Sequence, residues 1–88
     1  MEIAFSTSFR RTFRKRIAVD QELEAKYWQQ VRIFLQNPHD PRLRTHKLSG
    51  DLREIWSFSI GHDMRVVFFF AGDRKAVFTD VGKHDEVY

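Results

Sequence analysis

The sequence contains no cysteine, only two prolines and four glycines, and no long hydrophobic run. The lack of cysteine excludes disulfide scaffolds, thiol catalysis and Cys-ligated zinc sites. No apolar stretch approaches the roughly 18 residues that are needed to cross a bilayer. The first eight residues also lack the basic and then apolar order of a secretory signal. We therefore expect a soluble, cytoplasmic protein with no membrane partner.

The length of 88 residues predicts one domain that spans residues 1–88. A chain of this size lies above the limit of about 40 residues below which folding usually needs disulfides or metals. Hydrophobic residues make up 42% and charged residues 31%, which excludes both a disordered and a membrane-embedded chain.

Positive charge is concentrated near the N-terminus, although the formal net charge is only +3. Between Arg10 and Arg16 lie five cations, and the only acid among residues 1–19 is Glu2. A basic segment suits an anionic partner, such as a nucleic acid or an acidic protein. The same segment would also be the solvated face of a helix, and the charge pattern alone leaves both interpretations open.

The N-terminal residues predict a strand followed by a helix. Residues 2–6 alternate between polar and apolar side chains, as in a short strand. A hydroxyl among residues 6–8 can accept a hydrogen bond from the first turn of a helix and so cap it. Phe9, Phe13 and Ile17 then recur every four residues, so one helix face is apolar and the basic cluster lies mostly on the others.

A second helix is predicted to begin after Asp20, an N-cap residue with Glu22 and Glu24 in the first turn. It is expected to end at Asn37-Pro38, because the residue before proline avoids the helical region. Its apolar stripe consists of Leu23, Tyr27, Val31, Phe34 and Leu35. Two consecutive helices with a short connection indicate a helical hairpin.

The C-terminal half predicts three strands of an antiparallel meander, and residues 43–51 show no clear period. The predicted strands are residues 55–60, 65–70 and 75–81, with Gly82 ending the last. The middle strand is β-branched and aromatic, which is typical of a strand covered on both sides. At least one phenylalanine ring of residues 68–70 should nevertheless face outward unless a partner covers it.

The order strand, helix, helix, strand, strand, strand indicates an α+β fold, in which a helical hairpin covers one face of a largely antiparallel sheet. Residues able to do chemistry lie mostly in the C-terminal half. They are His46, Lys47, His62, Asp63, Arg65, Lys83, His84 and Tyr88. In a meander the third strand runs back towards the first turn, so the segment after it should lie beside residues 62–65. No H-x₃-H or H-E-x-x-H pattern supports a zinc site.

Three ordered segments resemble the RelE/YafQ superfamily of toxins from bacterial type II toxin–antitoxin systems. They are H-K-L-S-G (46–50), W-S-F-S-I-G-H-D-M-R-V-V-F (56–68) and D-V-G-K-H-D-E-V-Y (80–88). The resemblance covers about half of the chain in detail, and the helical half agrees in layout. It implies a RelE-like fold and an endoribonuclease that cleaves mRNA, usually on the ribosome. It also implies a cognate antitoxin partner and neither a metal nor a cofactor.

The resemblance also implies roles for single residues. By position, His46, Asp63, His84 and Tyr88 match the family's histidine ahead of the glycine, hairpin acid, C-terminal histidine and terminal aromatic, and Arg65 matches the strand arginine of the RelE branch. The sequence departs from the pattern at two positions. Ser59 stands where YafQ-type toxins usually have a catalytic histidine, and Asp80 stands where an arginine is expected.

The chemistry of these residue types supports the same interpretation. RNA cleavage without a metal needs a base for the ribose 2′-OH, an acid for the leaving 5′-oxygen and cations for the phosphorane. Histidine suits both proton transfers, so His84 could share them with His46 or His62. Asp63 could orient a histidine or act as the base, and Arg65 could bind the phosphate through two hydrogen bonds. The candidate RNA-binding residues are Lys47, Lys83, Tyr88, Arg10, Arg11 and Arg14, with Tyr88 stacking on a base.

Two other functions stay open at this stage. A ParE-like toxin of the same fold would inhibit DNA gyrase by binding, but it would not need His46, His84 or Tyr88. A homologue that binds RNA or an antitoxin without cleaving RNA is the other alternative, because Asp80 would weaken stabilisation of the phosphate.

Overall fold

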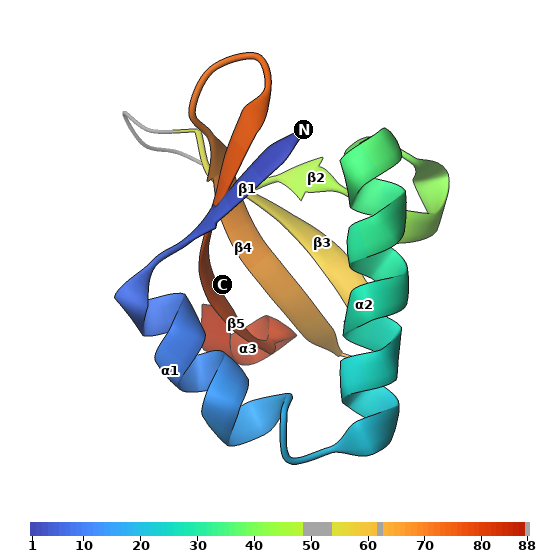
Figure 1. Ribbon diagram of the computed structural model, residues 1–88, viewed down its shortest axis with the longest axis vertical. Coiled ribbons are helices and arrows are strands. Elements are labelled where there is room, and N and C mark those ends of the chain that lie inside the picture. The colour runs from blue at the N-terminus through green and yellow to red at the C-terminus, as the bar shows by residue number, and fades with distance from the viewer. Residues whose placement is uncertain (49–53, 62, 88) are drawn as a thin grey trace.

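In the computed structural model, residues 1–48, 54–61 and 63–87 are described, and they form one five-stranded sheet with three α-helices (Figure 1). The elements are β1 (Glu2–Phe5), α1 (Thr7–Arg16), α2 (Gln21–Gln36), the 3₁₀ turn η1 (Pro41–Leu43), β2 (His46–Lys47), β3 (Trp56–Gly61), β4 (Met64–Phe70), β5 (Lys75–Lys83) and α3 (His84–Val87). The predicted α+β fold and its element order are confirmed. No local pattern in the sequence predicted η1, β2 or α3. No helix in the described part of the chain is long and apolar enough to span a membrane.

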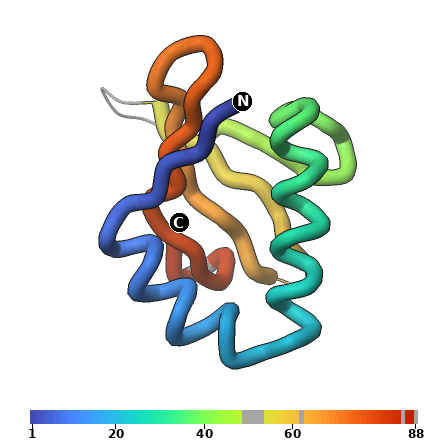
Figure 2. The backbone as a smooth tube through the Cα atoms, in the orientation of Figure 1, coloured from blue at the N-terminus to red at the C-terminus, as the bar shows by residue number. Residues whose placement is uncertain are grey.

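The sheet has the order β1-β5-β4-β3-β2, with the predicted antiparallel meander in its centre. β1 pairs in parallel with β5, so Glu2 lies opposite Lys75. The strand β5 does not end before Gly82 as predicted, because Gly82 pairs with Arg65 and the strand continues to Lys83. Figure 2 shows the N-terminal segment lying alongside the orange part of the chain that forms β5.

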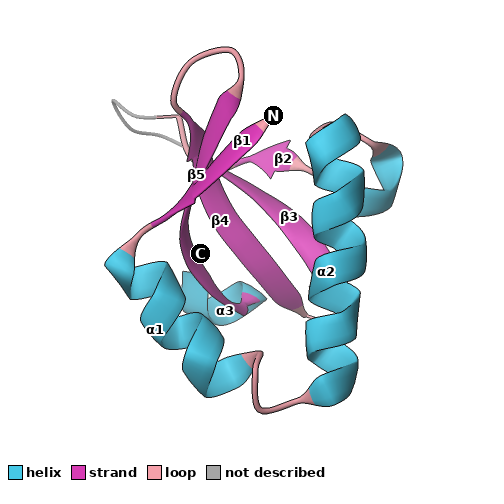
Figure 3. Cartoon of the chain, in the orientation of Figure 1, coloured by secondary structure: helices cyan, strands magenta, loops and turns pink. Residues whose placement is uncertain are grey.

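Both long helices begin at capping side chains that the sequence predicts. Ser6 Oγ accepts from the backbone N–H of Phe9 at 3.0 Å, and Asp20 Oδ1 accepts from that of Leu23 at 3.1 Å. The Ser6 hydroxyl also donates to the carbonyl of Thr79 at 3.0 Å, so it fixes the start of α1 to β5. Figure 3 shows that α1 and α2 lie in front of the sheet and cover the same face.

An aromatic core fills the space between the helices and this inner face of the sheet. Phe34 of α2 is fully buried, and its ring centroid lies 5.1 Å from Phe58, 5.0 Å from Phe68 and 5.4 Å from Phe78. Side chains that alternate along a strand point to opposite faces, so Phe58, Phe68 and Phe78 mark the inner face of β3, β4 and β5. Burial of each such ring stabilises the fold by about 1.5–3 kcal/mol.

The same alternation places Val67 and Phe69 of β4 on the outer face of the sheet. Val67 is buried and Phe69 is half-buried, whereas Phe68 and Phe70 pack inside with the core. Among residues 68–70, Phe69 is therefore the ring that faces outward, in line with the expectation from the sequence.

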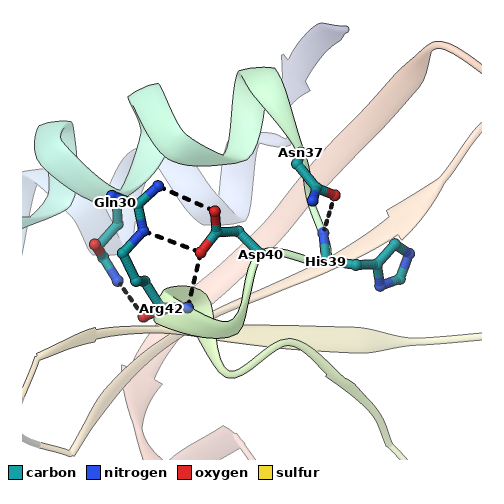
Figure 4. Close-up of polar contacts among 5 residues, drawn as sticks. All are labelled: Gln30, Asn37, His39, Asp40 and Arg42. Carbon is teal, nitrogen blue, oxygen red and sulfur yellow. Dashed lines mark hydrogen bonds and ion pairs between the residues drawn. The ribbon is translucent and has the colours of Figure 1, made fainter.

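Polar contacts at the end of α2 fix the segment that leads into β2 (Figure 4). The buried Gln30 side chain donates from Nε2 to the carbonyl of Arg42 at 3.1 Å and to that of Ser59 at 2.9 Å. Asp40 accepts from the backbone N–H of Arg42 and from two nitrogens of its guanidinium, at 2.9–3.0 Å. These contacts connect α2, η1 and β3 and so determine where β2 joins the sheet.

Candidate active site

The outer face of the sheet carries two rows of side chains that cross neighbouring strands. Strand register aligns His46, Ser57, Val67 and Asp80 in the first row. It aligns Ser59, Arg65 and Gly82 in the second row, two residues nearer to the turn between β3 and β4. Arg65 therefore lies in the middle strand of the meander, between the row of His46 and that turn.

The end of β5 meets the turn between β3 and β4, as the meander predicts. The backbone N–H of His84 donates to the carbonyl of Asp63 at 3.0 Å, and Lys83 lies opposite Met64. Asp63, Lys83 and His84 are all exposed. The structure therefore brings these three predicted site residues together next to Arg65. His62 and Tyr88 lie outside the described residues.

His46 and Lys47 lie away from this cluster, on the short edge strand β2. His46 is in register with Val67, four residues from Asp63 along β4 and two strands away. Ideal strand spacings put their backbones about 15 Å apart. His46 Nδ1 lies 3.1 Å from the carbonyl oxygen of Arg44, and Lys47 pairs with Glu54 at 3.0 Å. His46 thus lies at the far end of the face that holds Arg65, not in contact with His84.

The helix α3 is attached to the outer face through Glu86 and Gly82. Glu86 Oε1 accepts from the backbone N–H of Lys83 at 2.8 Å and forms an ion pair with Arg16 Nη1. A Cβ atom on Gly82 would lie 3.1 Å from Val87 Cγ1 and 3.3 Å from Glu86 Oε1. Glycine at position 82 therefore lets α3 fold back closely against β5, and it orients the segment that begins at His84.

Arg16 and Glu86 perturb each other's protonation. The hydrogen bond from Arg16 lowers the pKa of Glu86, and the hydrogen bond to Glu86 raises the pKa of Arg16. Sequence reasoning missed this pair because its members are 70 residues apart and no local pattern connects them. The meander and the Gly82-x-His84 spacing pointed to this corner of the molecule, but neither indicated Arg16.

Asp80 lies on the outer face, opposite Val67, where the family pattern would place an arginine. Its Oδ1 accepts from the backbone N–H of Val81 at 2.9 Å. Its charge also adds, in a minor way, to the raised pKa of Arg16. The residue is half-buried, so this row carries a negative charge beside the Arg65 row.

The basic residues of α1 lie on the helical side of the molecule. Arg10 and Arg14 line a groove of about 500 Å³ between α1 and α2, and the exposed Trp28 ring forms part of its wall. RNA binding by Arg10, Arg11 and Arg14 stays a prediction. Within the described residues, no group of three or more His, Asp and Glu side chains could hold a metal ion.

His39 lies in the turn after α2, and its ring packs against aromatic side chains. Its ring centroid lies 5.3 Å from that of Trp56 and 5.8 Å from that of Phe70. Both partners pack against the core on the inner side of the sheet. His39 is therefore separated from the outer face by the sheet itself.

No family model and no curated protein matches the chain, whereas solved structures do. A YoeB/ParE toxin from Agrobacterium tumefaciens aligns with a TM-score of 0.80 and 19% identity over 96% of this chain and 99% of that chain. YafQ in the Escherichia coli DinJ–YafQ toxin–antitoxin complex aligns with a TM-score of 0.73 and 17% identity over 99% and 96%. The archaeal RelE–RelB complex from Pyrococcus horikoshii gives 0.71 and 12% over 93% and 92%.

These alignments cover nearly the whole of both chains in each case, so this protein has the RelE-like fold. At 12–19% identity they show the fold and no more. The residues on the outer face of the sheet are therefore the basis for a function.

Proposed function

We propose that this protein is a RelE/YafQ-type toxin that cleaves mRNA on the ribosome without a metal. The observation that supports this most directly is the outer face of the sheet. There the backbone of His84 is hydrogen-bonded to that of Asp63, and Arg65 lies in the adjacent strand position. A general acid or base, a carboxylate and a phosphate-binding cation are what such cleavage requires.

In this mechanism the ribose 2′-oxygen attacks the adjacent phosphorus and the bond to the 5′-oxygen breaks. A base takes the 2′-OH proton, and an acid gives a proton to the leaving oxygen. His84 performs one transfer, and Asp63 or His62 performs the other. Arg65 neutralises the charge that builds up on the phosphorane. Lys83, which lines the cleft on the helical side of the hairpin, binds RNA beside the site. His46 and Lys47 contact the RNA farther along the same face of the sheet, and Tyr88 stacks on a base of that RNA.

The proposed partner in the cell is an antitoxin protein. Two of the aligned structures are complexes of this kind, DinJ with YafQ and RelB with RelE. Co-purification with the product of an adjacent short acidic reading frame, and loss of cleavage in its presence, would support this partner.

Mapping of mRNA 5′ ends after incubation with translating ribosomes tests the nuclease function. We expect new ends with wild type and about 10²-fold fewer with His84→Ala, since one acid–base group contributes about 10²–10⁴-fold. His39→Ala is the matched control, because His39 lies on the inner side of the sheet. Near-normal cleavage by folded His84→Ala protein would reject the assigned role.

A gyrase-inhibiting function is the second candidate, and Asp80 is the observation that favours it. A carboxylate in the row next to Arg65 repels a phosphate, and one aligned structure carries the description YoeB/ParE toxin. DNA supercoiling by gyrase in the presence of the protein separates the two functions. Inhibition of supercoiling together with intact mRNA would replace the nuclease function by this one.

A further inference from the structure

A basic cleft lies beside the edge of β3, and its cations were not among the residues that the sequence singled out. The cleft has a volume of about 480 Å³ and is lined by Lys26, Gln29, Arg42, Arg44, Ser59 and Gly61, among others. None of the described residues that line it is acidic. We name it the β3-edge cleft.

The cleft exists because β2 is too short to cover β3. The only register partners of β2 on β3 are Trp56 and Ser57, so no strand pairs with the outer edge of β3 beyond them in the described residues. Gln30 fixes α2 above this edge through its hydrogen bond to the Ser59 carbonyl at 2.9 Å. Residues of α2, of the segment around the 3₁₀ turn and of β3 thus form its walls.

Two of its three cations are available to a ligand. Arg42 is balanced by Asp40, which accepts from two of its guanidinium nitrogens. Lys26 and Arg44 are exposed and form no ion pair with another described residue. The stem of Lys26 lies along Gly61, whose φ of +121° suits glycine and whose Cβ would lie 3.1 Å from Lys26 Cγ. The charged end of Lys26 is thereby held close to the hairpin.

Arg44 has a backbone conformation that is uncommon for a residue with a side chain, with φ 52° and ψ 42°. Such a conformation is unfavourable for a residue with a side chain and persists only where the surrounding structure imposes it. The carbonyl of Arg44 also lies 3.1 Å from His46 Nδ1. Arg44 therefore connects the cleft to the His46 end of the outer face.

The cleft also extends towards the other end of the candidate site. Lys26 and Gly61 also line an adjoining cleft of about 1150 Å³, to which Lys83, Asp20 and Glu22 contribute as well. Lys83 precedes His84 directly. Lys26 and Lys83 therefore place positive charge on both sides of the hairpin of β3 and β4, between the His84 end of the site and the β3-edge cleft.

We propose that the β3-edge cleft binds the phosphate backbone of an RNA strand, on nucleotides that flank the cleaved bond. This inference rests on the proposed nuclease function, because it treats the outer face as the place where RNA is cut. The cleft supplies affinity and direction, whereas the cluster around His84 supplies the chemistry. Lys26 and Arg44 bind through charge and so confer little base preference.

Binding of a fluorescent 12-nucleotide RNA with 2′-O-methyl groups tests the cleft. This RNA cannot be cleaved through its 2′-oxygens, so binding is measured apart from the nuclease reaction. Anisotropy titrations at several salt concentrations would compare wild type with Lys26→Gln/Arg44→Asn. Asparagine is chosen because it tolerates the left-handed backbone of Arg44. The control is Arg32→Gln/Arg74→Gln, which removes the same charge from exposed residues outside the cleft.

We expect Lys26→Gln/Arg44→Asn to flatten the log–log salt slope by about 1.4, at about 0.7 per lost contact with a single strand. Affinity should fall about tenfold or more, with an unchanged melting temperature, and the control should keep the wild-type slope. Equal flattening in both variants would overturn the proposal, because net charge would then explain it. An unchanged slope in the cleft variant would overturn it too, and binding by an acidic protein would be the competing role. If the wild-type protein binds this RNA but does not cleave mRNA, the proposed nuclease function is rejected and RNA binding by the cleft is retained.

Discussion

The two faces of the sheet differ in what their side chains do, although they share the same strands. The inner face is closed by α1 and α2 and presents buried aromatic rings such as Phe58, Phe68 and Phe78. The outer face carries the half-buried Arg65 and Asp80 beside the buried Ser57 and Val67, and α3 packs against it at Gly82. Aromatic packing on one face thus stabilises the fold, whereas the other face holds charged groups. Substitutions on the two faces should therefore affect different measurements.

The largest effect on stability is expected from Phe34→Ala on the inner side. Removal of a fully buried ring leaves a cavity among Phe58, Phe68 and Phe78, which should lower the free energy of unfolding by about 3–5 kcal/mol. Urea unfolding measures the change. The neighbouring Leu35 is 42% exposed, so Leu35→Ala should change it by only about 0.5 kcal/mol. Equal losses for both variants would contradict this account of the core.

On the outer face, Arg65→Ala should reduce mRNA cleavage by about 10²-fold, which corresponds to about 2.7 kcal/mol of transition-state stabilisation. Arg65→Lys should restore part of the rate, because lysine cannot form two parallel hydrogen bonds with a phosphate. Cleavage rates and melting temperatures would be measured together. Full rescue by lysine would show that a point charge suffices, and a large fall in melting temperature with normal cleavage would make Arg65 structural.

Gly82→Ala should lower the free energy of unfolding by about 1–3 kcal/mol, since the added Cβ meets Val87 Cγ1 at 3.1 Å. Trimming that neighbour should relieve the crowding. The double variant Gly82→Ala/Val87→Ala should therefore be more stable than the sum of the single changes predicts. If the changes in the free energy of unfolding of the two single variants add up to that of the double variant, α3 does not press against Gly82.

The smallest effect concerns the ion pair between Glu86 and Arg16. Because the hydrogen bond lowers the pKa of Glu86 in the folded state, its stabilisation is fully present above the ordinary value of 4.5. It is lost as the pH falls through the lower folded value. Melting temperatures of wild type and Glu86→Gln should differ slightly at pH 7 and converge as the pH falls from 4.5 through the lower folded pKa of Glu86. A difference that grows towards acid would contradict the assigned sign. Asp40→Asn is a useful control, since Arg42 lowers the pKa of Asp40 in the same way far from His84.

Local signals in the sequence predicted the elements well, because helix starts depend on residues a few positions apart. Ser6 and Asp20 cap α1 and α2 through contacts three residues away. The meander followed from alternation and turns, and it correctly placed His84 beside Asp63. The parallel pairing of β1 with β5 had no such signal, because nothing in a four-residue strand specifies a partner more than seventy positions away.

The candidate site was predicted in its residue types more than in its geometry. The motif grouped His46 with His84, but register on a sheet depends on every strand between them, and it places His46 at the opposite end of the face. Lys26, Arg44 and Glu86 were missed for a related reason. Each gains its role from a neighbour that is distant in sequence, such as Gly61 for Lys26 or Arg16 for Glu86.

The pairing of β1 with β5 has a consequence for the order of events during synthesis. In the described residues, β5 is the only strand that pairs with β1. The N-terminal strand β1 therefore cannot pair until β5 has been synthesised. Chains dominated by such distant pairings fold slowly, because much of the polypeptide must be ordered before the contact forms. The same strand carries Gly82 and leads into His84. The candidate site around His84 therefore forms only after β5 has been synthesised and has joined the sheet.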